Sequence, residues 1–450
     1  MLIFQLIVKP YLHICAAFVR LYLLHSTHIY KADMVYLWCH YGRKGYSQVA
    51  PRYNPLWQYT TRMVHAGERL PVQPGQPTTT PLYTSTTYFH DNMSAFDAAL
   101  GGEGYAYGRN GNPTNIALEV AATAAEAGAG ALTTASGMSA IYTAILAAGA
   151  TLDRPMNCIL TARDMYGATT VLLRDFFAPN GIEVVTCDFT NLIALDDAIA
   201  RHKPDIIYAE QLSNPLFRVV DMAAIAARAK ACGARTIVDN TIATPIVEQP
   251  LTLGIDFVAH SATKYFSGHG DATGGLVIVR DTAYLAALRH INATLGMVLG
   301  PFEALQILRG MKTMSLRVER QCANALAVAT WLTIHPAIAQ VHYPGLPQHP
   351  DYAVAQRTLG GKYGAMLAFE LQQSSQLAPF ADALELVLPA STLGDIYTMI
   401  SVPALASHRG LSPAERQARG ISDGLIRMSV GIEAVEDIIA DMAHALSIIA

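Results

Sequence analysis

The sequence predicts an α/β protein in which a mainly parallel β-sheet forms a large domain and a smaller α+β domain follows it. The chain has 450 residues, which is too long for a single ordinary hydrophobic core. From Thr61 onward, short apolar stretches alternate with helical patterns, as in parallel sheets that carry helices on both faces. After about Pro301 the pattern changes to a long helical stretch and a second set of strands.

The strands of the large domain are expected where apolar stretches end in polar residues. Ligands of parallel α/β sheets bind beyond the carboxyl ends of the strands. Tyr166, Asn214, Asp239 and Lys264 collect at those ends, so the sequence places a binding site there. The expected strands lie within 157–167, 181–189, 204–212, 234–241 and 256–264, with helical patterns at 194–202 and 222–233.

The smaller domain is expected to begin with a linking helix. The helical stretch at 301–336 leads into strand-like stretches at 364–373, 384–391 and 424–432. The last of these contains Arg427 between apolar neighbours. An arginine so placed needs an anion, and a substrate carboxylate suits its bidentate guanidinium group. An internal salt bridge is the alternative.

Composition and charge narrow the class of function. The net charge is −4, and no dense basic run lies outside the N-terminal part, so we expect no nucleic-acid partner. The six cysteines form no CxxC pair and no zinc-like spacing. This pattern indicates reduced thiols, a cytoplasmic location and no bound metal.

Residues 1–60 differ from the rest of the chain and form an atypical N-terminal extension. The segment begins with an apolar stretch that Lys9 and Arg20 interrupt, so no run reaches the roughly 20 residues of a membrane span. A signal peptide would carry its charge before the apolar core and small residues after it, and this order is absent. We interpret the extension as non-native sequence before a start at Met34. An anchor, a targeting segment or a partner-binding arm is the alternative.

Lys264 is the residue that carries the most chemical information. It follows Ser261 and Thr263 within 260–275, and Asp239 ends an apolar stretch upstream. A lysine amine can form a Schiff base with an aldehyde, hydroxyl groups can bind phosphate, and an acid can keep a pyridine nitrogen protonated. This combination predicts a pyridoxal 5'-phosphate (PLP) site. Taken singly, such hydroxyls more often bond locally, and such an acid more often belongs to a turn.

A phosphate-binding end is expected at the start of a helix. The stretch 131–149 reads as a strand, a tight turn and a helix, with Gly137 and Met138 at the helix start. Backbone N–H groups at a helix N-terminus, helped by the helix dipole, bind phosphate well. An ordinary strand-to-helix turn is the alternative.

A series of motifs resembles, in order, those of the Cys/Met-metabolism family of PLP-dependent enzymes. This family includes cystathionine γ-synthases, cystathionine lyases, methionine γ-lyases and homoserine-ester sulfhydrylases. The motifs cover about 61–450, which is nearly everything beyond the extension. They are YAYGRNGNPTN, TASGMSAI, DMYGATT, EQLSNP, VDNTIATP, HSATKYFSGHGDATGG, LRGMKTMSLR, VHYPGL and ISDGLIRMSVGIE.

The resemblance implies an aspartate-aminotransferase-like architecture (PLP fold type I) and a homotetramer built from dimers that share active sites. It divides the chain into an N-terminal arm at 61–112 that contacts the partner subunit, a large PLP-binding domain at 113–305, and a linking helix with the small domain at 306–450. Within the arm, Tyr107 and Arg109 would reach the phosphate of the neighbouring subunit. A monomer would then have an incomplete site.

The resemblance also implies roles for individual residues. Lys264 would form the Schiff base, and Asp239 would contact the pyridine nitrogen. Tyr166, which by itself is either a core aromatic residue or a stacked ring, would stack on the cofactor. Arg427 would bind the substrate α-carboxylate with help from Thr392. The remaining contacts would be Asn214 near the phenolic oxygen, and Gly137, Met138, Ser261 and Thr263 at the phosphate.

The sequence departs from several relatives where the far end of the substrate is expected. Val171 and Thr392 stand where cystathionine-handling relatives carry an arginine and a glutamate, and Ala168 replaces the cysteine typical of methionine γ-lyases. An apolar Val171 suits a short or uncharged substrate side chain. We expect a carbon–sulfur lyase that acts by γ-elimination, like methionine γ-lyase or cystathionine lyase. The alternative is γ-replacement on an O-acyl-homoserine, as in cystathionine γ-synthase or homoserine-ester sulfhydrylase.

Lys264 and Tyr166 are the expected catalytic residues. The lysine would take the Cα proton of an amino-acid substrate, and Tyr166 would protonate the leaving thiolate or accept the proton of the incoming amine. A non-catalytic PLP-binding protein is a distant alternative, because it would be expected to lose Lys264, Asp239 or Tyr166. A nicotinamide-dependent enzyme would need a glycine fingerprint in the first strand–helix turn, which the sequence lacks.

Overall fold

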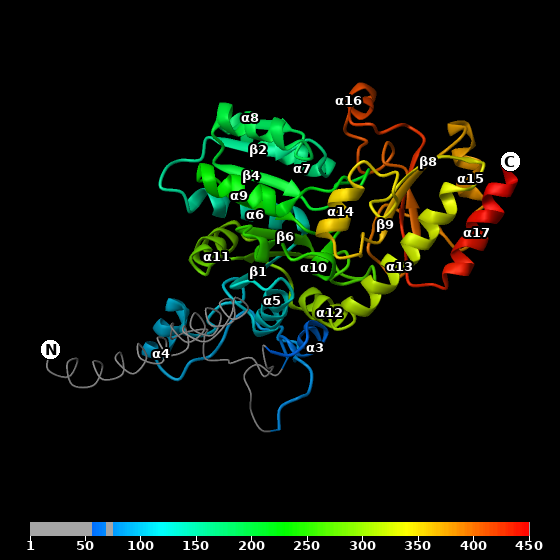
Figure 1. The fold of residues 1–450 in the computed structure, drawn as a ribbon. Coiled ribbons are helices and arrows are strands. Elements are labelled where there is room, and N and C mark those ends of the chain that lie inside the picture. The colour runs from blue at the N-terminus through cyan, green and yellow to red at the C-terminus, as the bar shows by residue number, and fades with distance from the viewer. Residues whose placement is uncertain (1–55, 69–74, 450) are drawn as a thin grey trace, which may run out of the picture. The chain divides into compact units, whose positions relative to one another are not determined.

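The structure is a computed structural model that describes residues 56–68 and 75–449. Most of the extension predicted at 1–60, with its candidate start at Met34, lies outside the described residues. Two β-sheets with helices packed against them organise the described part of the chain (Figure 1). None of the helices in 56–68 and 75–449 combines the length and apolar character that crossing a membrane requires.

The larger sheet confirms the predicted α/β fold class. It is built from β1 (Gly130–Thr134), β2 (Cys158–Ala162), β3 (Glu183–Cys187), β4 (Ile206–Glu210), β5 (Arg235–Asp239), β6 (Phe257–Ser261) and β7 (Gly275–Val279). Their order is β1-β7-β6-β5-β4-β2-β3. The strands from β3 across to β6 run parallel, and β7 is antiparallel to both of its neighbours.

The helices follow the strands in the alternation that the sequence predicted. They are α3 (Tyr59–His65), α4 (Met93–Ala98), α5 (Pro113–Ala125), α6 (Gly137–Ala150), α7 (Gly167–Leu172), α8 (Leu192–His202), α9 (Met222–Cys232), α10 (Thr244–Val247), α11 (Ala283–Leu295), α12 (Pro301–Met311), α13 (Met314–Thr333), α14 (Tyr352–Thr358), α15 (Leu377–Asp382), α16 (Pro413–Ala418) and α17 (Val435–Ile448).

The larger sheet lies between two layers of helices. Successive side chains of a strand point to opposite faces. In β4, Ile206 and Tyr208 join the hydrophobic cluster that α6 and α11 cover. Ile207 and Ala209 join the cluster on the other face, which α5, α8 and α9 cover. The sheet is therefore buried on both sides, and only its edges and strand ends remain for a ligand.

The smaller sheet has five strands and is mostly antiparallel. It consists of β8 (Ile338–His342), β9 (Met366–Leu371), β10 (Leu388–Pro389), β11 (Met399–Ser401) and β12 (Leu425–Ser429), in the order β10-β11-β12-β9-β8. Buried residues of α13 and α17 pack against it (Figure 1). The smaller α+β part is thus observed, whereas the exact domain boundaries at 112/113 and 305/306 stay predictions.

The helical stretch predicted at 301–336 forms two helices, α12 and α13, instead of one. Their junction is held by Arg317, whose guanidinium donates to the carbonyl of Gly310 at 2.8 Å and to the hydroxyl of Thr313 at 3.2 Å. Gly310 also packs against the backbone of Ser267, because a Cβ there would lie only 2.1 Å from the Ser267 carbonyl oxygen. The break therefore follows from tertiary contacts with the segment after Lys264, which the helical pattern does not contain.

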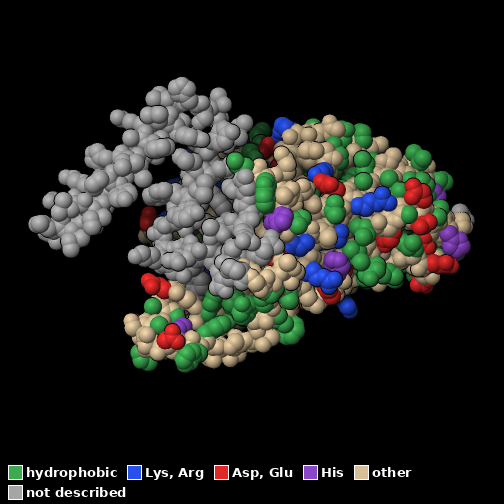
Figure 2. Space-filling model, turned by 90° about the horizontal axis from the view of Figure 1, so that it is seen from below, with side chains coloured by type: hydrophobic (Ala, Val, Ile, Leu, Met, Phe, Trp, Pro, Cys, Tyr) green, Lys and Arg blue, Asp and Glu red, His purple; other side chains and the backbone are tan. Residues whose placement is uncertain are grey.

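Charged side chains of both signs occur on the surface. Basic and acidic groups both appear on the face seen in Figure 2. This mixture agrees with the small net charge of −4.

Candidate active site

A cavity of about 460 Å³ opens at the carboxyl ends of the central parallel strands. Glu210, Asp239 and Ser261, which are the last residues of β4, β5 and β6, all line it. The structure brings most of the predicted site residues together in its wall: Gly137, Met138, Tyr166, Asn214, Asp239, Ser261, Thr263, Lys264 and Arg427. Thr392 lies between two lining residues, Ser391 and Leu393.

Lys264 lies in the turn after β6. Its backbone N–H donates to the carbonyl of Ser261 at 3.1 Å, and its Nζ donates to the hydroxyl of Thr392 at 2.9 Å. Burial, followed by the positive charge of Arg427, lowers the pKa of this amine, while Asp395 acts in the opposite direction. A lowered pKa favours the neutral amine, which is the form that attacks an aldehyde or accepts a proton.

The N-terminus of α6 meets the end of β6 at one side of the cavity. The hydroxyl of Ser136 caps the helix by accepting from the N–H of Ser139 at 3.2 Å. The N–H groups of Gly137 and Met138 lie in the first turn and have no partner within the helix. A Cβ at Gly137 would lie 2.7 Å from the Cβ of Ser261, so only glycine allows this approach. The free N–H groups and the helix dipole suit a phosphate group.

Hydrogen bonds fix the turn that carries Ser261, Thr263 and Lys264. The backbone N–H of Ser261 donates to the hydroxyl of Thr241 at 2.8 Å. The hydroxyl of Thr263 accepts from the N–H of Gly274 at 3.0 Å. The turn is thereby tied to the segments that follow β5 and precede β7, which holds both predicted phosphate-binding hydroxyls beside the cavity.

Asp239 faces the cavity as an acid without a paired cation. Its carboxylate accepts from the backbone N–H of Thr241 at 2.9 Å and from the Thr241 hydroxyl. Burial raises its pKa, and it takes part in none of the ion pairs formed within 56–68 and 75–449. A protonated pyridine nitrogen would supply the missing positive charge. With Lys264 and the N-terminus of α6, this acid shows that the residues present fit PLP.

Arg427 lies on β12 and is only 4% exposed. Its guanidinium donates to the side-chain oxygen of Asn214 at 3.4 Å and to the carbonyl of Thr392 at 3.2 Å. Burial lowers its pKa to about 10. No carboxylate in the described part of the chain forms an ion pair with it, so the alternative of an internal salt bridge is wrong here. A buried guanidinium without a counter-ion suits a small anion that enters the cavity.

Tyr166 directly precedes α7 and reaches the cavity, where its side chain keeps 37% exposure. Its backbone N–H donates to Glu210 Oε1 at 2.6 Å. Glu210 is a lining residue that we did not predict from the sequence. A signal was present, because the stretch 204–212 carries an acid after an apolar run, just as 234–241 does.

Asp395 is a second acid that the sequence patterns did not single out. It is 4% exposed, and its carboxylate accepts from the backbone N–H of Gly270. Burial raises its pKa, and the positive charge of Lys264 lowers it. Asp395 therefore favours the protonated form of Lys264 and opposes the influence of burial and Arg427. Nothing in the local sequence indicates that its charge would act on Lys264.

Four residues discussed from the sequence lie outside the cavity wall of this single chain. Arg109 donates to the carbonyl of Ala293 at 2.6 Å, and its guanidinium carbon lies 5.6 Å from the centre of the Tyr107 ring. Ala168 and Val171 lie on α7, and neither is among the described residues that line the cavity. The roles predicted for these residues stay predictions.

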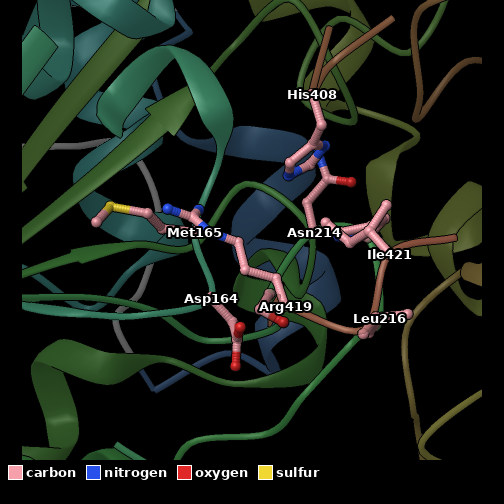
Figure 3. A pocket seen from close by; sticks show the side chains of 9 residues that line it. Asp164, Met165, Asn214, Leu216, His408, Arg419 and Ile421 are labelled. Carbon is pink, nitrogen blue, oxygen red and sulfur yellow. The ribbon is translucent and has the colours of Figure 1, made fainter. Parts of the chain in front are cut away.

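A small second pocket lies beside Asn214 (Figure 3). The imidazole of His408 bonds to the backbone of Asn214, and its Nδ1 lies 2.9 Å from the hydroxyl of Ser407. Figure 3 shows the side chains of His408 and Asn214 next to each other. Burial lowers the pKa of His408 to about 4, so its ring is neutral at physiological pH. His408 thus supports Asn214 from the second pocket as a neutral hydrogen-bonding group.

A lysine beyond the end of a parallel strand, next to a helix N-terminus and an unpaired acid, is the arrangement that a PLP-dependent enzyme requires. The chain belongs to the Cys/Met metabolism PLP-dependent enzymes, whose family model matches residues 60–447. The predicted family, the fold class and the cofactor are therefore confirmed. The protein is a transsulfuration-type enzyme of sulfur amino-acid metabolism.

Relatives with different reactions resemble the chain almost equally. A cystathionine β-lyase of Coxiella burnetii is 36% identical over 86% of this chain and 97% of its own length. An L-methionine γ-lyase of Fusobacterium nucleatum is 38% identical over 81% and 92%. The structure of a cystathionine γ-synthase of Xanthomonas oryzae, in complex with cystathionine, is 35% identical with a TM-score of 0.81, and the match covers 87% and 98%. Overall similarity therefore does not select one reaction.

A methyl group at Gly137 should disturb cofactor binding more than folding. Gly137→Ala would place its Cβ against Ser261 at the start of α6. We expect the dissociation constant for PLP, measured by titrating apoenzyme and following the visible absorption, to rise at least about tenfold, which corresponds to 1.4 kcal/mol. Gly149→Ala, in the same helix, is the control. A Cβ at Gly149 would lie 3.4 Å from the flexible side chain of Met156, which follows the helix. Equal PLP affinity in both variants would contradict the role assigned to this helix start.

Proposed function

We propose that the protein is a carbon–sulfur lyase that acts by γ-elimination on a small sulfur amino acid, of the methionine γ-lyase or cystathionine lyase type. The observation that carries this proposal is the charge of the cavity wall. Among the described lining residues, the basic groups are Lys264 and Arg427, and the acidic groups are Glu210 and Asp239. If Lys264 and Asp239 serve the cofactor and Arg427 serves the substrate α-carboxylate, no cation remains for a second amino-acid head. Methionine then suits the cavity better than cystathionine.

The lining residues divide into groups with different tasks at the cofactor. Lys264 would carry PLP, Asp239 would pair with its pyridine nitrogen, and Tyr166 would stack on its ring. When bound, PLP supplies an electron-accepting ring that stabilises the negative charge left when a proton leaves the substrate carbon. The other contacts are Asn214 at the phenolic oxygen and Gly137, Met138, Ser261 and Thr263 at the phosphate. The unpaired acid and the close approach at Gly137 support these assignments.

Arg427 binds and orients the substrate. Its guanidinium is buried and has no counter-ion in the described part of the chain. Its two terminal nitrogens, Nη1 and Nη2, donate to the side chain of Asn214 and the Thr392 carbonyl. An α-carboxylate in the cavity would neutralise this charge with bidentate geometry. Thr392, whose hydroxyl accepts from Lys264, helps to hold the arrangement. A substrate fixed in this way presents its Cα hydrogen to a base nearby.

Lys264 and Tyr166 move the protons. The Lys264 Nζ has a lowered pKa, so the neutral amine is available to take the proton from Cα. Tyr166 gives its phenolic proton to the sulfur as the Cγ–S bond breaks. A Cβ proton leaves as well, so that a Cβ–Cγ double bond forms as the thiol departs. A proton added at Cγ then moves the double bond to Cα–Cβ, and hydrolysis of this enamine yields 2-oxobutyrate and ammonia. The overall reaction consumes one water and produces one thiol, one 2-oxobutyrate and one ammonia.

γ-Replacement on an O-acyl-homoserine is the second candidate. The similarity to the Xanthomonas oryzae cystathionine γ-synthase favours it. The same residues would bind the cofactor and the α-carboxylate, and an incoming thiol would replace the acyloxy group at Cγ. A non-catalytic PLP-binding protein is disfavoured, because Lys264, Asp239 and Tyr166 are all present.

The assembly is part of the same proposal. Tyr107 and Arg109 contribute to the phosphate site of a neighbouring subunit in a homotetramer of two dimers, with 61–112 as the arm that contacts the partner. The exposure of Tyr107 in the single chain, which is 44%, supports this proposal. The cysteines in the described part of the chain are free thiols, which supports a cytoplasmic location.

A substrate panel tests the proposed reaction. We expect methionine to give methanethiol, ammonia and 2-oxobutyrate, measured by product analysis of the PLP-loaded enzyme. The same enzyme should form little new thioether from acetyl- or succinylhomoserine with cysteine. If thioether formation from these homoserine esters exceeds 2-oxobutyrate release, the enzyme instead catalyses γ-replacement. Pyruvate from cystathionine as the main product would establish β-elimination.

Removing the phenolic hydroxyl of Tyr166 should impair the reaction without unfolding the protein. Positioned proton transfer contributes roughly 10²–10⁴-fold, so we expect kcat of Tyr166→Phe to fall by about that factor on whichever substrate the panel identifies. Tyr352→Phe, on α14, is the control and should keep its activity. Near-normal turnover of Tyr166→Phe would remove this residue from the proton transfer.

A further inference from the structure

Glu210 connects two of the residues to which the reaction assigns roles. It is the last residue of β4, lines the cavity and is 4% exposed. Its Oε1 accepts from the backbone N–H of Tyr166 at 2.6 Å. The backbone N–H of Asn214 faces the same carboxyl group and lowers its pKa. One side chain therefore contacts the backbone of two loops that follow different strands, β2 and β4.

The hydrogen bond from Tyr166 to Glu210 is difficult to replace. A buried backbone N–H without a partner costs about 1–3 kcal/mol, and a loop can avoid this cost only by moving. The Tyr166 N–H lies directly before α7, where no helical carbonyl can accept it. Asn214 is also bonded through its backbone to His408 and through its side chain to Arg427. Movement of Asn214 would therefore disturb the group that binds the substrate carboxylate.

A neighbouring acid acts on Glu210 in addition to burial. Glu210 is paired in register with Asp239 on β5. Burial, followed by the negative charge of Asp239, raises the pKa of Glu210 well above its ordinary value. Asp239 is better placed to keep its charge, because it receives two hydrogen bonds from Thr241 and lies near His260. A neutral Glu210 can still accept hydrogen bonds through its carbonyl oxygen.

We propose that Glu210 is a positioning residue that fixes Tyr166 by accepting its backbone N–H and that lies against the backbone of Asn214. It does not touch the reacting atoms. This inference rests on the roles proposed above for Tyr166 and Asn214. The amide of a glutamine has the same shape and carries one carbonyl oxygen, so it can keep the hydrogen bond to the Tyr166 N–H. A methionine has nearly the same volume but no comparable acceptor.

Three variants of the PLP-loaded enzyme test the proposal. Glu210→Met removes the acceptor, Glu210→Gln keeps it, and Glu210→Asp withdraws it by one methylene group. A misplacement of about 1 Å can cost roughly 10²-fold in rate, so we expect kcat of Glu210→Met to fall by about 10- to 100-fold. Its visible circular dichroism, which reports how the bound cofactor is held, should change. Glu210→Gln should keep kcat within about threefold and an unchanged spectrum, with Glu210→Asp between the two.

Asp205 provides a matched control at the other end of the same strand. It is 1% exposed, directly precedes β4 and accepts from the backbone N–H groups of Asn157 and Cys158 at 2.6 and 3.0 Å. Glu210 lies five positions further along the chain, roughly 16 Å away at the usual rise of a strand. Asp205→Leu should lower the unfolding temperature and leave kcat and the visible spectrum of the folded enzyme unchanged.

The outcomes separate the alternatives. Wild-type kcat and an unchanged spectrum in Glu210→Met would overturn the proposal. So would a Glu210→Gln variant as impaired as Glu210→Met, because the charge and not the acceptor would then matter. If Glu210→Met does not fold, the comparison of Glu210→Gln with Glu210→Asp decides, and equal activity of these two would contradict the proposal. A wild-type protein that binds no PLP would instead refute the function on which the proposal rests.

Discussion

The parallel register of β4, β5 and β6 is the constraint on which the site depends. Parallel strands in register end at the same edge of the sheet, and here they deliver Glu210, Asp239 and Ser261 to one cavity. The turn after β6 adds Lys264, and the N-terminus of α6 packs so closely on Ser261 that only glycine fits at position 137. A slip of one residue in any of these strands would turn its terminal side chain to the other face. The chemistry is therefore positioned by the most deeply buried part of the molecule.

Charge without a partner is the second feature that connects structure and function. Arg427 is buried and Asp239 is half-buried at the cavity, and within the described residues neither forms an ion pair. Isolated buried charges are costly, so such groups are retained only where something else supplies the opposite charge. A pyridine nitrogen and a substrate carboxylate would do so. The charge of Arg427 also lowers the pKa of Lys264, and the carboxyl group of Asp395 raises it.

The fold and the centre of the site could be predicted because their signals are local. Apolar runs that end in Asp239 and just before Lys264 mark parallel strands and their carboxyl ends, and a glycine at a helix start marks Gly137. Residues that depend on distant contacts were missed. Glu210 serves two loops, and Asp395 approaches Lys264 from beyond residue 390. The break between α12 and α13 was missed for the same reason, since Ser267 packs against Gly310 from outside the local pattern. The contacts predicted for Tyr107 and Arg109 belong to a second subunit, so their roles stay predictions.

The most direct test is to determine which residue carries the cofactor. The purified protein should be yellow, and borohydride should reduce its linkage to PLP into a stable bond. Peptide mass spectrometry should then find the pyridoxyl phosphate group on Lys264, with the label absent from Lys264→Ala. A colourless protein that takes up no PLP, or a label on another lysine, would contradict the assignment on which every other role in the site depends.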